Sequence, residues 1–407
     1  MNVRGWPREL WNFAKGSVKL IVKGPPAYWA WLAFLLALLA AGIVAYLHQL
    51  NHGLITTAMR DPVSWGMYIG NFTFLVGVAA AAVVLVIPAY VYDWKPIKEI
   101  VILGEILAVS AIVMCVLFVT VDIGRPDRIW HILPLVGSMN FPISLLAWDV
   151  IVLSGYGLLN FFIVTYYLSK LYNKKPYNKK VLWPLVIVSI PMAVSIHTVT
   201  AFLYNGLAAR PYWNASILAP RFLASAFCSG PAIMLILLQV LQRATSFEIK
   251  KEALWKIAEL MAYAMFINLF LLGAELFKEY YSDTEHLLFH KYAFHGIGEH
   301  KAIVPFMWTA LFFQITAFLL FLIPRTRKSV LGLNLGCLLI YGGVYIEKGM
   351  GLVIPGFTPS TLGEIYEYTP SFNEITVTAG VFAAGFLVFT LMCKVAVPIL
   401  LGEFSKA

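Results

Sequence analysis

The sequence predicts an all-α integral membrane protein with ten transmembrane helices, and three observations support that fold class. Hydrophobic residues make up 60% of the 407 residues and charged residues 13%, about half of the roughly 25% found in a soluble domain. The mean hydropathy is +0.79. Apolar runs of about 20 residues, the length that crosses roughly 30 Å of hydrocarbon, occur ten times. They lie at 26–47, 65–92, 99–121, 142–169, 181–204, 216–241, 254–277, 302–323, 329–346 and 375–399.

The positive charges orient these runs. Alternate connections carry most of the 30 Lys and Arg residues, with at least two in each: 1–25, 93–98, 170–180, 242–256, 324–328 and 394–407. Because basic segments stay inside, both termini should lie in the cytoplasm, and we expect a multi-pass protein of the cytoplasmic membrane. The longer connections, 48–64, 122–141, 205–215, 278–301 and 347–374, then face outward. The net charge of +9 is a topology signal, so it does not indicate nucleic-acid binding.

In chain order, residues 1–25 should form an amphipathic segment on the cytoplasmic membrane surface, because basic and apolar residues interleave there. Residues 26–172 would form a first four-helix bundle, 181–324 a second, 329–399 two additional helices, and 400–407 a cytoplasmic tail. The second and sixth runs are both rich in small residues, which let helices approach closely in lipid. This similarity is a faint sign of two related bundles.

The cysteine and histidine positions argue against a bound metal or haem. The four cysteines are isolated within apolar runs and form no CxxC pair: Cys115, Cys228, Cys337 and Cys393. We therefore expect neither an iron–sulfur cluster nor a zinc site. A b-type haem needs two facing histidines, but only His197 lies well inside a run. The outer connection 278–301 holds four histidines, and a solvated loop that docks a partner explains them better than a metal site.

Ionisable residues inside the runs are costly, so they indicate function. Five fall in the outer half of the membrane: Asp122, Asp149, His197, Arg221 and Glu275. A quinone site needs an apolar cleft with aromatic walls, donors for the head-group oxygens, and bases that accept protons. We predict Asp149 and His197 as the catalytic pair. The predicted quinone-binding residues are Asn71, Tyr68, Trp65, Trp148, Asp122, Arg125 and His48, and the predicted inner entrance of a proton path is Glu259 with Glu105.

Each of these residues also has a structural interpretation. Asp122 could close its hairpin through an ion pair with Arg125, and Asp149 could hydrogen-bond between helices. His197 could be a satisfied core histidine, and the aromatic residues could form an interfacial belt. The two inner glutamates could extend toward Lys98 and Lys256. A membrane subunit that only translocates protons or ions, or only anchors partners, is therefore the alternative to quinone chemistry.

Several motifs together resemble one family. They are Trp65–Phe72, Asp122–Pro126 with the pattern Asp-x-Gly-Arg-Pro, Ser144–Asp149, His197–Phe202, Arg210–Trp213 and Ala219–Phe222. The chain resembles the NrfD, or polysulfide-reductase-like, family of quinone-interacting membrane subunits. Within this family, the number of runs and the amino-acid sequence of the fifth run are most similar to those of the DsrP (HmeB) branch, the membrane subunits of sulfite-reductase-associated complexes. Some relatives place a histidine midway along the second run, where this chain has alanines, which puts any proton route through that histidine in doubt here.

The resemblance implies a function and partners. The substrate would be a quinone, with menaquinone expected, bound near the outer face of a subunit that itself holds no haem, cluster or metal. The subunit would exchange electrons and protons between quinone and partners in sulfur (sulfite or sulfate) metabolism. These partners would be an extracytoplasmic ferredoxin-like iron–sulfur subunit, a multihaem cytochrome c, and a cytochrome b membrane subunit with a cytoplasmic iron–sulfur subunit.

Overall fold

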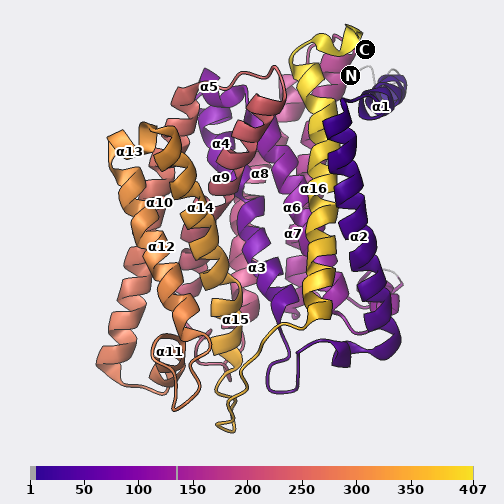
Figure 1. Cartoon of the computed structure of the whole chain (residues 1–407). Coiled ribbons are helices and arrows are strands. Elements are labelled where there is room, and N and C mark those ends of the chain that lie inside the picture. Colours follow the sequence, from indigo (N-terminus) through magenta and orange to yellow (C-terminus); the bar gives the residue numbers. More distant parts are fainter. Residues whose placement is uncertain (1–5, 134–135, 407) are drawn as a thin grey trace.

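The computed structural model describes residues 6–133 and 136–406, in which long helices run side by side (Figure 1). Within those residues ten helical segments are long and apolar enough to cross a membrane, which confirms the predicted fold class. They are α2 (Pro26–His52), α3 with α4 and η3 (Met67–Ala79, Ala81–Val86, Ile87–Val91), α6 (Val101–Asp122), α7 (Leu145–Tyr172), α8 (Lys179–Asn205), α9 (Leu218–Ala244), α10 (Lys251–Ser282), α12 (Val304–Leu322), α14 with α15 (Val330–Lys348, Met350–Phe357) and α16 (Phe372–Leu400).

Shorter helices lie at the two ends of the molecule: α1 (Trp6–Ile21), η2 (Leu54–Thr56), α5 (Lys95–Lys98), η4 (Pro126–Ile132), α11 (His286–Phe294), α13 (Pro324–Lys328) and η5 (Glu403–Lys406). Both chain ends lie at one end of the bundle (Figure 1). We call this end, with the connections 92–100, 173–178 and 245–250, the terminal face. The opposite end, with the connections 53–66, 206–217, 283–303 and 358–371, is the loop face.

Helix α1 lies at the terminal face, where the amphipathic segment was predicted; residues 1–5 of that segment, like Ala407 of the tail, lie outside the described residues. Glu9 of α1 is buried against α7, and its carboxylate pairs with Lys170 at 2.6 Å and with Lys175 at 2.7 Å. Trp11 and Val18 remain exposed. Helix α1 is therefore attached to the bundle through a buried carboxylate and through aromatic contacts such as that of Phe13 with Tyr172, while Trp11 and Val18 are available to meet lipid.

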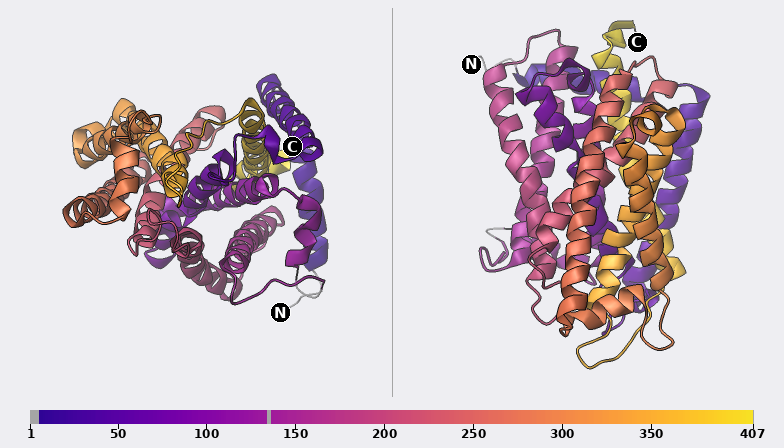
Figure 2. Two further views of the ribbon diagram at one scale, coloured as in Figure 1. Left: turned by 90° about the horizontal axis from the view of Figure 1, so that it is seen from below. Right: turned by 90° about the vertical axis from the view of Figure 1, so that its left-hand side faces the viewer.

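The transmembrane helices pack in two groups that meet at α9. The first group is α3 with α4, α6, α7 and α8, in which each helix contacts the next and α8 returns to α3. The second is α9, α10, α12 and α14, which also close on one another. Helices α2 and α16 pair at one edge, with α16 resting on α6 (Figure 2). These contacts differ from the predicted division into 26–172, 181–324 and 329–399, because α8 packs against α7 as well as α9.

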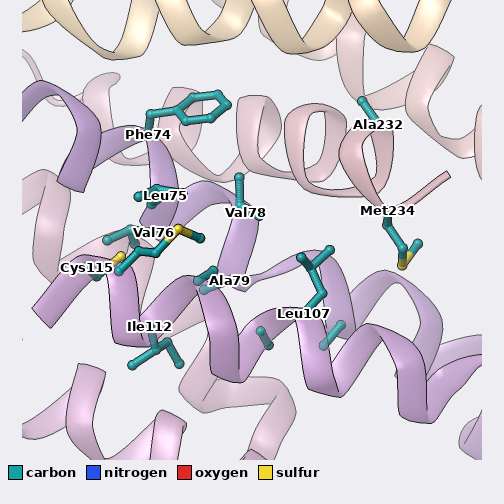
Figure 3. Close-up of a cluster of buried hydrophobic side chains, with 14 of the residues drawn as sticks. Phe74, Leu75, Val76, Val78, Ala79, Leu107, Ile112, Cys115, Ala232 and Met234 are labelled. Carbon is teal, nitrogen blue, oxygen red and sulfur yellow. The ribbon is translucent and has the colours of Figure 1, made fainter. Parts of the chain in front are cut away.

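Small residues bring these helices together. At the edge, the backbones of Gly42 in α2 and Gly380 in α16 are so close that a Cβ on either would overlap the other. Where the two groups meet, Gly77 of α3 faces Ala226 and Ser229 of α9. Figure 3 shows the dry core beside this contact, in which apolar side chains of α3, α6 and α9 interdigitate. The small-residue runs are thus helix-packing surfaces.

Two connections predicted as loops are partly helical and buried. The outward connection 347–374 begins with helix α15, a continuation of the ninth span beyond Gly349. Its residues are buried, and Gly356 leaves room for the indole of Trp213, which a Cβ would overlap. The connection 278–301 likewise contains α11, whose His290 is 4% exposed. The prediction of a fully solvated loop was wrong there, because the tertiary contacts bury short helices that a sequence window cannot detect.

Candidate functional site

The predicted catalytic pair lies on neighbouring helices in the half of the bundle nearer the loop face. Helix α7 begins at Ser144, whose hydroxyl accepts a hydrogen bond from the Ala147 amide at 3.3 Å. This start places Asp149 in the second turn, where it is 4% exposed. The Thr200 hydroxyl of α8 donates to the Asp149 carboxylate at 2.8 Å. The structure therefore gives Asp149 one hydrogen-bond donor, on the helix that also carries His197.

His197 lies one turn before Thr200 on the same face of α8 and is 1% exposed. Its Nδ1 lies 2.9 Å from the carbonyl oxygen of Ala193, which makes Nδ1 the protonated nitrogen of the neutral ring. The other nitrogen, Nε2, has no hydrogen-bond partner among the described residues. His197 is thus a buried base whose Nε2 lone pair receives no hydrogen bond from the described residues.

A hollow of about 400 Å³ opens at the loop face, and the described residues that line it do not include Asp149 or His197. It is lined by Ser64, Trp65, Gly206, Leu207, Ala208, Ala209, Arg210 and Phe357. The wall is apolar except for Ser64 and the half-buried guanidinium of Arg210, which lies 4.8 Å from the ring centroid of Phe357. Burial lowers the pKa of Arg210 from its ordinary value. The volume and the single cation are suited to a flat ring with a polar oxygen.

Trp65 joins this hollow to the interior. Its ring centroid lies 5.5 Å from that of Tyr204 and 5.6 Å from that of Trp213. Tyr204 follows Thr200 by one turn of α8, and its hydroxyl is hydrogen-bonded to Thr73 of α3. Trp65 therefore does form an aromatic wall, and its neighbour Tyr204 lies on the same helix as Thr200.

Asn71 and Tyr68 are buried as predicted, but their polar groups connect helices. The Tyr345 hydroxyl of α14 donates to the Asn71 carbonyl oxygen at 2.9 Å, and the Asn71 amide donates to the Met67 carbonyl at 2.8 Å. The Tyr68 hydroxyl donates to the side chain of Gln49 in α2 at 2.8 Å. Both side chains hold α3 against its neighbours in this conformation.

The suggested ion pair between Asp122 and Arg125, which would close the hairpin, was wrong. Arg125 forms a two-pronged pair with Asp127, at 2.9 and 2.8 Å, and both side chains are exposed. Arg125 lowers the pKa of Asp127 through these hydrogen bonds. Asp122 forms no ion pair with Arg125, and its Oδ1 is buried with no hydrogen-bond partner among the described residues. The Arg125 side chain prefers the neighbour two residues ahead because the chain turns into η4 at Pro126.

Two further predicted quinone residues lie apart from the pair. His48 is exposed on α2, where its ring packs on His52 with centroids 4.3 Å apart. Trp148 is 38% exposed, and its indole donates to the Pro142 carbonyl at 2.8 Å. Both face outward from the helix group that contains Asp149. A hydrophobicity plot cannot reveal this, because it does not fix the rotation of a helix.

The two glutamates of the predicted inner path differ. Glu259 is half-buried at the surface, where it contacts Lys256 at 3.3 Å, Tyr263 at 2.9 Å and Arg327 at 3.6 Å. The structural alternative of an ion pair with Lys256 is therefore confirmed. Glu105, by contrast, is 1% exposed in α6, and its Oε2 has no hydrogen-bond partner within the described part of the chain.

A second polar cluster, which the predicted site did not include, lies in the other helix group. Arg221 of α9 pairs with Glu275 of α10 and with Glu347 of α14. The Gln314 amide donates to Glu347 at 2.6 Å, and Lys348 lies 3.5 Å from the same carboxylate. The four charged side chains are all 8% exposed or less. Two positive and two negative charges balance, which lowers the cost of burying the cluster in lipid.

The sequence held part of the signal for this cluster. Arg221 and Glu275 were recognised as intramembrane charges, but their pairing joins helices that are distant in the chain. The glycine-rich ninth run was predicted to end at residue 346, so Glu347 and Lys348 were assigned to the outward connection 347–374. In the structure Gly349 is a short break before α15, and the pair stays buried. Within residues 6–133 and 136–406, no three His, Cys, Asp or Glu side chains group as metal ligands would.

These features define a polytopic helical membrane protein with protonatable side chains in its interior and an apolar hollow at one face. The profile of the family described as "Polysulphide reductase, NrfD" matches residues 55–359. This chain therefore belongs to the NrfD family, which confirms the predicted resemblance at family level.

Three curated relatives are similar over nearly the whole chain. A putative membrane subunit of dimethyl sulfoxide reductase from Halobacterium salinarum is 26% identical and covers 88% of each chain. A selenate reductase subunit from Mesobacillus selenatarsenatis is 25% identical, over 86% of this chain and 89% of the relative. The integral membrane subunit of an Hdr-like menaquinol oxidoreductase from Archaeoglobus fulgidus is 22% identical, over 90% and 92%.

Proposed function

We propose that this chain is the quinone-interacting membrane subunit of a respiratory redox complex. Three lines support the proposal: membership of the NrfD family, relatives named as reductase or menaquinol oxidoreductase subunits, and the presence of buried bases and an apolar hollow in the same half of the bundle. The basic connections of the terminal face favour a cytoplasmic position for that face. The hollow at the loop face would then open toward the outside of the cell membrane.

The chemistry follows from what a quinol must lose. Oxidation of one quinol releases two electrons and two protons, so the site needs acceptors for both. We assign proton acceptance to Asp149 and His197, the buried carboxylate and the buried base with a free nitrogen. Trp65 would stack on the head group, and Arg210 would stabilise negative charge on its oxygen. The electrons would pass to a cofactor of a partner protein at the loop face.

The observation that carries this proposal is the position of Asp149. Its carboxylate lies in the half of α7 nearer the loop face and is buried next to the helix that packs on Trp65. Among the described residues, the one side-chain hydrogen bond that it receives comes from Thr200. A carboxylate that served only to join two helices would gain from more donors than one, because desolvation of its charge is costly. Asp149 is instead left with unused acceptor capacity.

The test is Asp149→Asn in the complete membrane complex, with Asp127→Asn on the exposed hairpin as the matched control. Asparagine keeps the shape and can still accept from Thr200, but it cannot take up a proton. Quinol-dependent reduction should fall by about 100-fold or more, while the complex remains assembled and the control keeps its activity. Full activity in Asp149→Asn would exclude the assignment.

The partners and pathway belong to the same proposal. The family resemblance supports an outer ferredoxin-like iron–sulfur subunit, a multihaem cytochrome c, and a cytochrome b subunit with a cytoplasmic iron–sulfur protein, in sulfur metabolism. Menaquinone is the quinone favoured, because one relative is named a menaquinol oxidoreductase subunit. Haem and iron analysis of a complex purified through this chain would test the partners, since a preparation free of both would contradict them.

A second candidate function is proton conduction across the first helix group. The observation that favours it is the unpaired, buried Glu105 near the terminal face. The hydroxyl of Tyr156 in α7 is also buried without a hydrogen-bond partner within the described residues. Two such groups between the terminal face and His197 would suit a proton route, whereas Glu259 is paired at the surface.

A further inference from the structure

A small cavity lies where the two helix groups meet. Its volume is about 10 Å³, which is about the least that can hold one water molecule. Side chains of α3, α8, α9 and α14 line it: Thr73, Phe74, Gly77, His197, Phe222, Ser225, Ala226, Ser229, Val344 and Lys348. Two of its polar atoms, Nε2 of His197 and Oγ of Ser229, are buried with no hydrogen-bond partner among the described residues. A water in this cavity would satisfy both.

Lys348 is the one charged side chain among the described residues that line this cavity. It is 4% exposed, and its ammonium lies 3.5 Å from the Glu347 carboxylate and 5.1 Å from the centre of the Phe222 ring. The ion pair uses one of its three N–H donors. Lys348 therefore belongs to the charge cluster of the second helix group while it borders the cavity of His197 in the first.

The cluster also borders a second cavity on its other side. This cavity too measures about 10 Å³, and its lining includes Arg221, Glu347, Gln314, Tyr212 and His290. His290 belongs to α11 at the loop face, and burial lowers its pKa from the ordinary value. Two water-sized cavities thus flank the Glu347–Lys348 pair, one toward His197 and one toward the loop face.

We propose that Lys348 exchanges protons with His197 through one water in the cavity between the helix groups, so that the second group carries protons of the quinone reaction to the loop face. This inference rests on the proposed function, because it requires His197 to gain and lose protons. It assigns a role to Lys348 that is distinct from substrate contact: Lys348 is a proton-relay residue, and it touches neither the hollow nor Asp149 in the described contacts.

The exchange balances. When quinol is oxidised, its two electrons leave to the oxidised cofactor of the partner, Asp149 accepts one of its two protons, and the other goes to Nε2 of His197. Lys348 first releases its own proton toward Glu347 and the second cavity, and the proton on His197 then passes through the water to the neutral Lys348. The charge of the relay is therefore the same before and after each turnover. Quinone reduction would run the same steps in reverse.

The experiment compares Lys348→Arg with Lys348→His in the complete membrane complex. Arginine keeps the positive charge and the pairing with Glu347, but it does not release a proton at any pH of the assay. We expect quinol-dependent reduction in Lys348→Arg to fall by about 100-fold, with assembly unchanged. Lysine and histidine differ in ordinary pKa by about four units, so Lys348→His should retain activity with a profile displaced to lower pH. Lys291→Arg, on the exposed side of α11, is the control.

Each outcome decides the proposal. Parental turnover in Lys348→Arg would overturn it, because charge alone would then suffice. If Lys348→Arg does not assemble, the histidine variant decides: a displaced pH profile supports the relay, and an unchanged profile overturns it. The titratable groups that face Lys348 are Glu347, Glu275 and His197, and Arg221 is a permanently charged neighbour. The Asp149→Asn variant, measured alongside, separates the proposed quinone function from the proposed relay. If Asp149→Asn is fully active, the proposed function is wrong. If Asp149→Asn is inactive and Lys348→Arg is active, only the relay is wrong.

Discussion

Replacement of Arg221 by methionine should destabilise this protein more than any exposed charge substitution. Arg221 joins α9 to α10 through Glu275 and to α14 through Glu347. Methionine has a similar length but no charge, so the change removes both pairs and leaves the helix packing largely intact. The three side chains are 8% exposed or less, so water does not screen their charges and the energies of buried ion pairs apply.

The size of the stability loss depends on which carboxylate loses its ion-pair partner. Glu347 retains Lys348 and Gln314. Glu275 loses the one ion-pair partner that it has in the described structure. Removing one partner of a buried ion pair costs about 3–5 kcal/mol, and we expect Arg221→Met to fall in that range. The double variant Arg221→Met/Glu275→Gln should recover a large part of the loss, because it neutralises the orphaned carboxylate.

Tryptophan fluorescence of the purified protein in detergent, followed through thermal unfolding, measures the effect. Arg125→Met is the matched control, since Arg125 pairs with Asp127 at the surface and such pairs contribute about 0–1 kcal/mol. The expected order of stability is parent and control, then the double variant, then Arg221→Met. A single variant as stable as the control, or a double variant less stable than the single, would refute a buried, charge-balanced cluster.

Two further predictions concern the terminal face. Glu105→Gln should abolish charge movement coupled to electron transfer in proteoliposomes while quinol oxidation continues, if the second candidate function holds; unchanged charge movement would rule that route out. The hydrogen bonds of two lysines lower the pKa of Glu9, so its ion pairs are fully formed above the ordinary carboxyl pKa and are lost as pH falls through the lowered one. Protease cleavage at α1 should therefore increase on acidification, and Glu9→Gln should show the acid pattern already at neutral pH; equal cleavage of parent and variant at neutral pH would contradict this role.

Some features of the candidate site could be predicted from the sequence pattern and others could not. The depth of Asp149 and His197 was predicted by counting residues along two apolar runs, and the structure places both in the half of the bundle nearer the loop face, on helices that contact each other. The exposed positions of His48 and Trp148 did not follow, because neither run is amphipathic enough to show which side meets lipid. Helix rotation depends on contacts with neighbouring helices, which can be far away in the chain.

The partners of the polar side chains were even harder to predict from the sequence than the rotation of the helices. The Asp-x-Gly-Arg-Pro hairpin suggested a pair between Asp122 and Arg125, yet Arg125 pairs with Asp127, two residues ahead, because the turn at Pro126 aims the side chains apart. The cluster around Arg221 joins four helices from residues 221 to 347, and no local pattern predicts that meeting. Arg210 was visible only as part of a motif, and its place beside the hollow depends on the buried helix α15.

The sequence by itself determined the ten membrane-spanning helices, the basic character of one face, the family, and the residues whose burial would be costly. Length, hydropathy and charge are properties of single segments, so a chain read in order reveals them. The tertiary structure decided the grouping of helices around α9, the partners of each buried charge, and the cavity that brings His197 to Lys348. Those features arise where helices from distant parts of the chain pack together, and their energy depends on geometry that only the packed molecule has.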